Sequence, residues 1–254
     1  MERQDYIAVF DSGVGGISVL RHLVRLMPGE HFLYFGDSAN APYGTRSTEA
    51  VRKLTFAAVE HLYQSYPIKA LVLACNTATA AAVADLREAY PDRIIVGIEP
   101  AVKLAADHFP GGRVGVMATQ VTLREEKFDT LVHKWDSHCQ VAKIPAPGLV
   151  ELVEAGKADS PEADALLQRV LGPYVGALDA LVLGCTHFPF AAPAITRVLG
   201  DGVALLDGGE GTARETKRRL EGAGLLEKGT GGLEFLNSSP DQGRLQLCRR
   251  LLNS

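Results

Sequence analysis

The sequence has no long apolar run. Its longest apolar stretches have the length of a strand, and residues Met1 to Asp5 contain no apolar signal core. Charge of one sign is also scarce, since 26 basic and 30 acidic side chains give a net charge of −4. We therefore expect a soluble, cytoplasmic protein without a membrane segment, and we do not expect nucleic acid as its main partner.

Cysteine is scarce as well, with four residues in a chain of 254. None belongs to a Cys-x-x-Cys spacing or is matched to a His-x-x-x-His segment, which argues against a disulfide framework and a structural zinc site. The turn Gly13 to Gly16 lacks both a Gly-Lys-Ser/Thr ending and a full Gly-x-Gly-x-x-Gly. We therefore expect reduced thiols, no structural zinc site and no nucleotide phosphate loop.

Two of the four cysteines end copies of one short pattern, at 71–77 and 181–187. Each copy is an apolar run followed by a small residue, a cysteine and a residue with a hydroxyl or amide group. This is typical of a buried strand that delivers a thiol to its carboxyl end. Because Cys75 and Cys185 lie 110 residues apart, we expect two halves of similar fold, each holding one thiol.

Strand and helix patterns alternate along the whole chain, which predicts the α/β class with mainly parallel sheets. We expect two pseudo-symmetric doubly wound lobes, one formed by 1–98 with 207–254 and the other by 99–206, with the active site in the cleft between them. Helices are expected after most strands, including one capped by Ser47 and one at about 122–134, and a loop is expected at 229–232. Strands are expected at 6–10, 31–35, 70–74, 94–97, 113–117, 140–144, 179–184 and 203–206.

Polar residues follow several of these strands at the ends where ligands bind in open parallel sheets. We expect them on one rim, and they are Asp11, Asp37, Cys75, Thr119 and Cys185.

Each repeated thiol is expected just before a helix, whose amino terminus would stabilise a thiolate. Two thiols on opposite sides of one substrate suit stereoinversion at a carbon that bears a proton, because one base removes the proton and the opposed acid returns another. Asn76, Thr77 and Thr186 would bind a carboxylate or ammonium group. Asp11 is either a helper of its thiol or a helix cap, and His187 is either a helper or a core histidine.

At these residues the chain resembles the glutamate racemase family, bacterial enzymes that make D-glutamate for peptidoglycan without pyridoxal phosphate or metal. The matching blocks run through most of the chain in the family's order. They are Phe10 to Gly16, Gly36 to Ser38 with Pro42 to Gly44, Ala74 to Ala78, Leu149 to Gly156, and Gly184 to Pro189.

The resemblance implies that Cys75 deprotonates D-glutamate and Cys185 deprotonates L-glutamate, each serving as acid in the reverse direction. Asp11 and His187 would assist them, and Asp37 and Glu154 would influence catalysis less directly. Glu151 lies nearby in helical space and competes with Glu154 for that role. Substrate contacts would come from Ser12, Tyr43, Gly44, Asn76, Thr77, Thr119 and Thr186.

Alternatives remain open at this stage. A second enzyme hypothesis is aspartate racemase or another two-cysteine amino-acid racemase, because side-chain length selection depends on geometry. A hypothesis of another class is a protein-binding regulator of DNA gyrase. For either racemase we expect a small-molecule substrate and a homo-oligomer, a dimer.

Overall fold

The computed structural model describes residues 5–124, 130 and 138–254. The chain divides into two compact units, which we treat separately: unit 1 is Met1–Ile98 with Gly209–Ser254, and unit 2 is Glu99–Gly208. The second passage between the units lies two residues later than expected, because strand β8 (Ala204–Asp207) of unit 2 includes Asp207.

Unit 1 is built on a five-stranded sheet in the order β4-β3-β1-β2-β9, and all its neighbouring strands are parallel. The inner strands are continuous apolar runs because helices cover both faces of the sheet. The strands are β1 (Tyr6–Asp11), β2 (His31–Gly36), β3 (Ile68–Leu73), β4 (Ile94–Gly97) and β9 (Gly232–Asn237).

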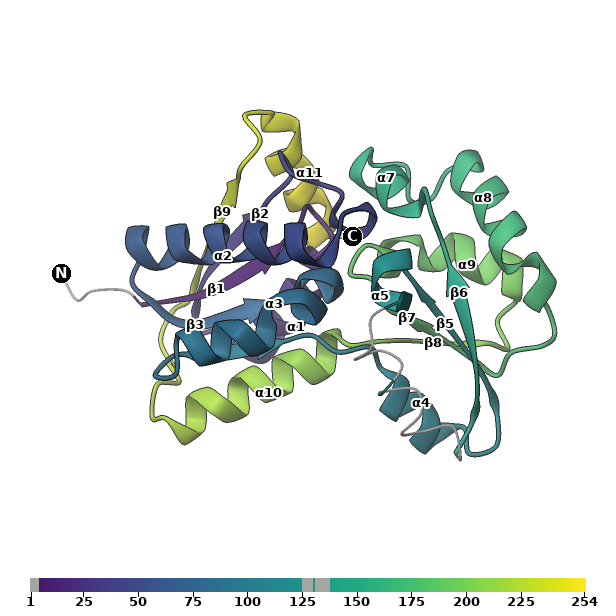
Figure 1. The fold of residues 1–254 in the computed structure, drawn as a ribbon, viewed down its shortest axis with the longest axis horizontal. Coiled ribbons are helices and arrows are strands. Elements are labelled where there is room, and N and C mark those ends of the chain that lie inside the picture. The colour runs from purple at the N-terminus through teal and green to yellow at the C-terminus, as the bar shows by residue number, and fades with distance from the viewer. Residues whose placement is uncertain (1–4, 125–129, 131–137) are drawn as a thin grey trace. The chain divides into compact units, whose positions relative to one another are not determined.

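Helices α2 (Thr48–Ser65) and α3 (Asn76–Ala89) pack on one face of this sheet (Figure 1). Helices α1 (Ile17–Leu26), α10 (Gly209–Gly222) and α11 (Gln242–Leu252) pack together on the other face. The predicted cap of α2 is confirmed, since the Ser47 side chain accepts a hydrogen bond from the Ala50 amide. A short 3₁₀ helix, η1 (Tyr43–Thr45), lies between β2 and α2.

The carboxyl-terminal part of the chain lies in unit 1, where β9 pairs with β2 at the edge of the sheet. The loop predicted at 229–232 ends one residue too late, because Gly232 is the first residue of β9. The sequence did not predict this strand. Strand β9 pairs on one side only and carries Glu234 and Asn237 among its apolar residues. An edge strand needs no continuous apolar run, so its pattern is weak.

Unit 2 has a four-stranded parallel sheet in the order β6-β5-β7-β8, with β5 at Arg113–Ala118, β6 at Gln140–Pro145 and β7 at Ala180–Leu183. Helices α7 (Leu149–Glu154), α8 (Pro161–Leu171) and α9 (Ala192–Leu199) pack on one face, while α4 (Val102–His108) and α5 (Gln120–Arg124) pack on the other. The 3₁₀ helices are η2 (Gly172–Tyr174) and η3 (Phe188–Ala191).

The predicted α/β class with two parallel sheets is thereby confirmed. Of the helix expected at about 122–134, residues 125–129 and 131–137 lie outside the described part of the chain. Among the described helices, none is both long and apolar enough to cross a membrane.

A buried ion pair ties the returning chain to the sheet of unit 1. The Lys69 ammonium lies 2.7 Å from Glu30 Oε2, and both side chains are almost fully buried. Lys69 Nζ also donates to the Leu225 carbonyl at 2.8 Å, and the Glu227 amide donates to Glu30 Oε1 at 2.8 Å. The pair therefore fastens the segment between α10 and β9 to the amino-terminal ends of β2 and β3.

We predict that Lys69→Ala lowers the free energy of unfolding by about 3–5 kcal/mol, because it leaves the Glu30 carboxylate buried without its partner. Urea denaturation followed by circular dichroism measures this. Lys53→Ala is the matched control, since Lys53 pairs with Glu49 on an exposed helix face and its loss should change stability little. Equal effects of the two substitutions would contradict the assignment.

Candidate active site

The predicted site residues of unit 1 gather at the carboxyl ends of its parallel strands, which we call the rim of the unit. Asp11 is the last residue of β1, Asp37 follows β2 directly, and Cys75 comes two residues after β3. Phe10 in β1 pairs with Phe35 in β2 and with Leu73 in β3, so these strands end level with one another. Parallel pairing therefore brings the three polar side chains to one edge of the sheet.

Cys75 caps the amino terminus of α3, as predicted for this thiol. Its Sγ accepts a hydrogen bond from the Ala78 amide at 3.4 Å and donates to Ser12 Oγ at 3.5 Å. The side chain is 5% exposed. The amide and the positive end of the helix dipole both point at this sulfur, an arrangement that suits negative charge.

The turn after β1 is held tightly against its surroundings. The Asp11 carboxylate is fully buried and accepts a hydrogen bond from the Gly13 amide at 2.8 Å. A side chain at Gly16 would overlap Asp11 and Ala74, so glycine allows the start of α1 to approach both strands. The Tyr34 hydroxyl donates to the Gly13 carbonyl at 2.8 Å and fixes the turn from β2.

Asp37 is buried and its carboxylate is fully engaged by the loop that follows β2. The Tyr43 hydroxyl donates to Asp37 Oδ2 at 2.6 Å, and Asn40 Nδ2 lies 3.0 Å and 3.1 Å from the two carboxylate oxygens. Burial and then the bond to Asp37 raise the pKa of Tyr43 well above its usual value, so the phenol remains a donor. The hydroxyl of Tyr43 is therefore engaged by Asp37.

Asn76 follows Cys75 and has polar atoms without a protein partner. Both Asn76 Nδ2 and Oδ1 are buried and make no hydrogen bond within the described chain. A buried amide without a partner is costly, and such groups in a native structure require an explanation. Its position at the rim, beside Cys75, makes it a candidate for binding a polar ligand.

Unit 2 presents the second predicted set on its own rim. Thr119 follows β5 directly, and Cys185 comes two residues after β7. The five residues expected on one rim are thus divided between the two sheets. Thr119 Oγ1 accepts a hydrogen bond from the Thr122 amide at 3.3 Å at the start of α5, and Cys185 and Thr186 are 7% and 3% exposed.

Cys185, His187 and Glu154 form a chain of polar contacts in unit 2. Cys185 Sγ lies 3.7 Å from His187 Nδ1, and His187 Nε2 lies 2.7 Å from Glu154 Oε1. Burial lowers the pKa of His187, but the contacts with Cys185 and Glu154 outweigh it and raise this pKa well above 6.5. These contacts therefore favour the protonated form of the imidazole, which lies beside the sulfur.

The structure separates the two acidic residues that the sequence left as alternatives. Glu154 is the last residue of α7 and reaches His187 at the start of η3, whereas Glu151 is exposed in the first turn of α7. Packing of α7 against η3 thus selects Glu154 as the partner of His187.

One local expectation for Cys185 is wrong, since α9 does not start directly after this cysteine. A turn at Thr186 and His187 and then η3 come first, with the Phe188 amide donating to the Cys185 carbonyl at 3.0 Å. Pro189 and Pro193 lack the amide that a regular helix interior needs, which confines them to first turns and delays the α-helix to Ala192. The imidazole of His187, and not the amino terminus of α9, therefore lies beside this sulfur.

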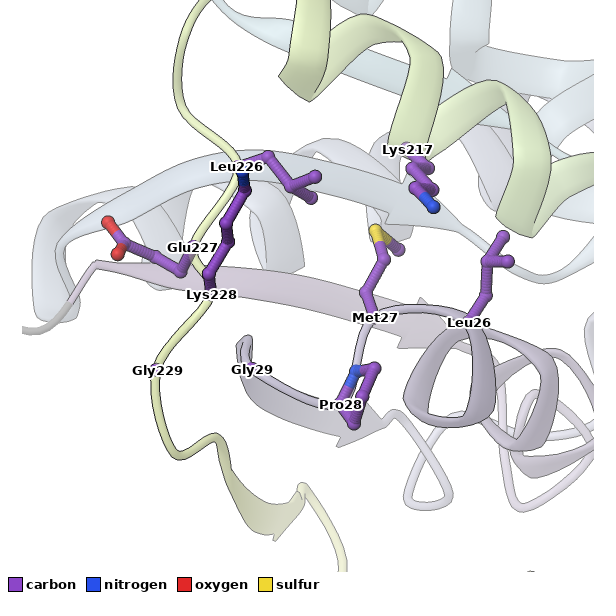
Figure 2. Close-up of a pocket in the computed structure, with 9 residues that line it drawn as sticks. All are labelled: Leu26, Met27, Pro28, Gly29, Lys217, Leu226, Glu227, Lys228 and Gly229. Carbon is purple, nitrogen blue, oxygen red and sulfur yellow. The ribbon is translucent and has the colours of Figure 1, made fainter.

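A metal site or the open pocket of unit 1 would be an alternative to these rims as a functional site. Within the described residues no three His, Cys, Asp or Glu side chains lie close enough to hold a metal ion. A pocket of about 270 Å³ lies between 26–29 and 226–229, where Lys217 reaches in from α10 (Figure 2). These segments precede β2 and β9, so the pocket is at the amino-terminal end of the sheet and contains none of the predicted site residues.

Sequence reasoning missed two residues that support the rim of unit 1. Asn40 binds Asp37 from three positions further along, and Tyr34 supports the turn at Gly13 from the neighbouring strand. The Asp-x-x-Asn spacing in a turn was a usable signal for Asn40, because asparagine side chains commonly bond nearby loop groups. Tyr34 had no such signal, since it occupies an ordinary apolar position of β2.

The comparisons with known proteins agree with this geometry. A family model described as Asp/Glu/Hydantoin racemase matches residues 7–216. Glutamate racemase of Clostridium perfringens strain SM101 is 45% identical over 249 residues, which cover 97% of this chain and 95% of that protein.

Two solved structures have the same fold over nearly their full lengths. Glutamate racemase isoform RacE1 of Bacillus anthracis matches with a TM-score of 0.89 and 33% identity, covering 100% of this chain and 96% of that one. Escherichia coli glutamate racemase in complex with L-glutamate and the activator UDP-MurNAc-Ala matches with a TM-score of 0.87 and 33% identity, covering 98% and 95%. These relatives lend no support to the aspartate-specific or gyrase-binding hypotheses. The chain belongs to the Asp/Glu/hydantoin racemase family and is one of its glutamate racemases.

Proposed function

We propose that this racemase exchanges the Cα proton of glutamate between Cys75 and Cys185 without a cofactor. The observation that carries the proposal is that each unit holds one cysteine just after an inner parallel strand, with a polar partner at its sulfur, the Ala78 amide at Cys75 and the His187 imidazole at Cys185. Such a mechanism requires one thiol from each unit at opposite faces of one carbon. The Escherichia coli relative was solved in complex with L-glutamate, which supports glutamate as the substrate.

In the direction from D- to L-glutamate, we assign the base to Cys75. Its thiolate takes the Cα proton, the electron pair of the C–H bond delocalises into the carboxylate, and the Cys185 thiol donates its proton to the opposite face. The Ala78 amide, which donates to Cys75 Sγ, would support the thiolate before the transfer, and Ser12 Oγ would accept from the thiol that the transfer forms. We keep Asp11 as a helper, since its buried carboxylate lies on the same rim.

In the opposite direction, Cys185 is the base. The His187 imidazolium stabilises the Cys185 thiolate, and Glu154 keeps that imidazole protonated and oriented. After each turnover the protonation states of the two cysteines are reversed, so the enzyme is ready for the other enantiomer. In this mechanism Cys185 exchanges the proton with the substrate, and His187 contacts Cys185. Glu154 acts only through His187.

We assign substrate binding to polar groups on the two rims. The unpaired amide of Asn76 is the strongest support, because a bound carboxylate and ammonium group would satisfy its buried donor and acceptor. Fixed donors in a cleft of low dielectric would also stabilise charge that develops toward the carboxylate. The remaining proposed contacts are Ser12, Tyr43, Gly44, Thr77, Thr119 and Thr186.

Asp37 is better described as a positioning residue, because both of its carboxylate oxygens are occupied within unit 1. We further propose that the product, D-glutamate, enters peptidoglycan synthesis in the bacterial cytoplasm, and that the enzyme acts as a homodimer. These last points rest on the family resemblance.

We predict that Cys75→Ala and Cys185→Ala each lower kcat/KM by at least about a thousandfold, because each removes one of two proton carriers. Chiral chromatography of D- and of L-glutamate incubated with each variant measures the loss. Cys139→Ala and Cys248→Ala are the controls and should keep most activity, since both thiols are buried in packing positions. Full activity of either first variant would rule out the two-base mechanism.

Racemisation in deuterated water tests the same mechanism in the wild-type enzyme. The product should carry solvent deuterium at Cα while recovered substrate carries little, because the base that removes a proton is not the acid that returns one. Mass spectrometry of the two separated enantiomers reads this out. Extensive deuterium in recovered substrate at early times would instead indicate a single base.

We predict that Glu154→Gln shifts the alkaline limit of activity to lower pH. His187 owes part of its raised pKa to Glu154, so the variant should lose the imidazolium, and with it the stabilised thiolate, at a lower pH than the wild type. The readout is kcat/KM from pH 6 to 10. Glu151→Gln is the control on the same helix and should leave the profile unchanged; an unshifted limit in Glu154→Gln would refute the role.

A further inference from the structure

The loop at 37–46 is organised around the Asp37 carboxylate. Asn40 makes more hydrogen bonds to this carboxylate than any residue predicted for the site does. Asn40 Nδ2 bonds both oxygens of Asp37, and the Asn40 amide donates to the Asp37 carbonyl at 3.0 Å. The Asn40 carbonyl in turn accepts from Arg46 Nε at 2.9 Å. The half-buried side chain of Asn40 thus holds the start of the loop, while its backbone carbonyl holds the end.

The same carboxylate also holds the middle of the loop. Asp37 Oδ2 accepts the Tyr43 hydroxyl at 2.6 Å, and the Asp37 and Tyr43 side chains are 4% and 1% exposed. Hydrogen bonds to an ionised carboxylate are stronger than those between neutral groups, and more so in a buried position. The conformation of the segment that carries Tyr43 and Gly44 therefore depends on where Asp37 is held.

We propose that Asn40 is a positioning residue for substrate binding: by holding the Asp37 carboxylate it fixes the backbone of Tyr43 and Gly44. This rests on the proposed function, in which those two residues contact glutamate. Without Asn40, the loop would have to become ordered when the substrate binds, and binding would weaken by that ordering cost. The proton transfers use cysteines on other segments, so KM should change much more than kcat.

An aspartate in place of Asn40 sharpens the test, because it keeps the shape and replaces the donor by a second carboxylate. Two carboxylates at this distance repel each other unless they share a proton, and lower pH supplies that proton. The titratable groups near the Asp37–Tyr43 pair come from three segments. Tyr43 bonds Asp37, Arg46 bonds the Asn40 carbonyl, and Asp11 at the end of β1 and Cys75 after β3 act electrostatically on Tyr43.

The experiment compares KM and kcat for both enantiomers in the full-length wild type, Asn40→Ala and Asn40→Asp. Asn40→Ala should raise KM about tenfold and change kcat by less than about threefold, as expected for the loss of charge-assisted bonds. Asn40→Asp should raise KM about thirtyfold at pH 8.5, and its ratio to the wild-type KM should fall toward the Asn40→Ala value or below as pH decreases to 6.

Asn237→Asp is the matched control at the same end of the sheet, since Asn237 Nδ2 bonds Ser38 Oγ and not Asp37. Its KM should stay within about twofold of the wild type. Thermal unfolding identifies a variant that fails to fold. If Asn40→Ala is such a variant, Asn40→Asp alone tests the role of Asn40.

Three results would overturn the role of Asn40: wild-type KM in both Asn40 variants, a fall in kcat without a rise in KM, or an equal rise in Asn237→Asp. A wild-type enzyme that does not racemise glutamate would instead refute the proposed function, so the two failures are distinguishable.

Discussion

Parallel pairing within each sheet is the constraint on which the candidate site depends. In unit 1, residue 10 of β1 is level with residue 73 of β3, and in unit 2 Met117 of β5 is level with Leu183 of β7. The first polar residues after these strands must therefore emerge along one edge of each sheet. A shift of register by one residue would turn every side chain of a strand to the other face.

The two thiols have different polar partners, although they follow similar strands. Cys75 caps a fourteen-residue helix and receives a backbone amide, while Cys185 lies in a turn beside an imidazole that also contacts Glu154. A helix terminus supplies a fixed partial charge, whereas an imidazole can carry a full charge that titrates. The repeated pattern thus provides two sulfur atoms in different polar surroundings.

In unit 1 the buried ion pair and the predicted site residues lie at opposite ends of the sheet. The Glu30–Lys69 pair and the pocket near Met27 lie at the amino-terminal ends of the strands, and Asp11, Asp37 and Cys75 lie at the carboxyl ends. Buried ion pairs of this kind stabilise a fold only when both partners are present. Substitutions at the amino-terminal end can therefore change folding without changing the polar groups at the rim.

The sequence by itself determined the elements whose signals are local. Continuous apolar runs predicted the inner strands, and Ser47 predicted the start of α2. The duplicated cysteine pattern indicated the two strand ends that are followed by Cys75 and Cys185. Only the tertiary structure decided the features that depend on partners distant in the chain. It revealed β9, which is a strand because β2 offers it an open edge, and it selected Glu154 over Glu151 because α7 packs against η3.

The loop at 37–46 combines both kinds of information. Its length and its turn residues were readable in the sequence, but the bonds from Asn40 and Tyr43 to one buried carboxylate exist only in the folded loop. Periodicity reports which face of an element is buried, because burial of apolar surface acts along the whole element. It does not report which polar atoms meet, because a hydrogen bond forms only within a few tenths of an ångström and at suitable angles, and tertiary packing alone sets that geometry.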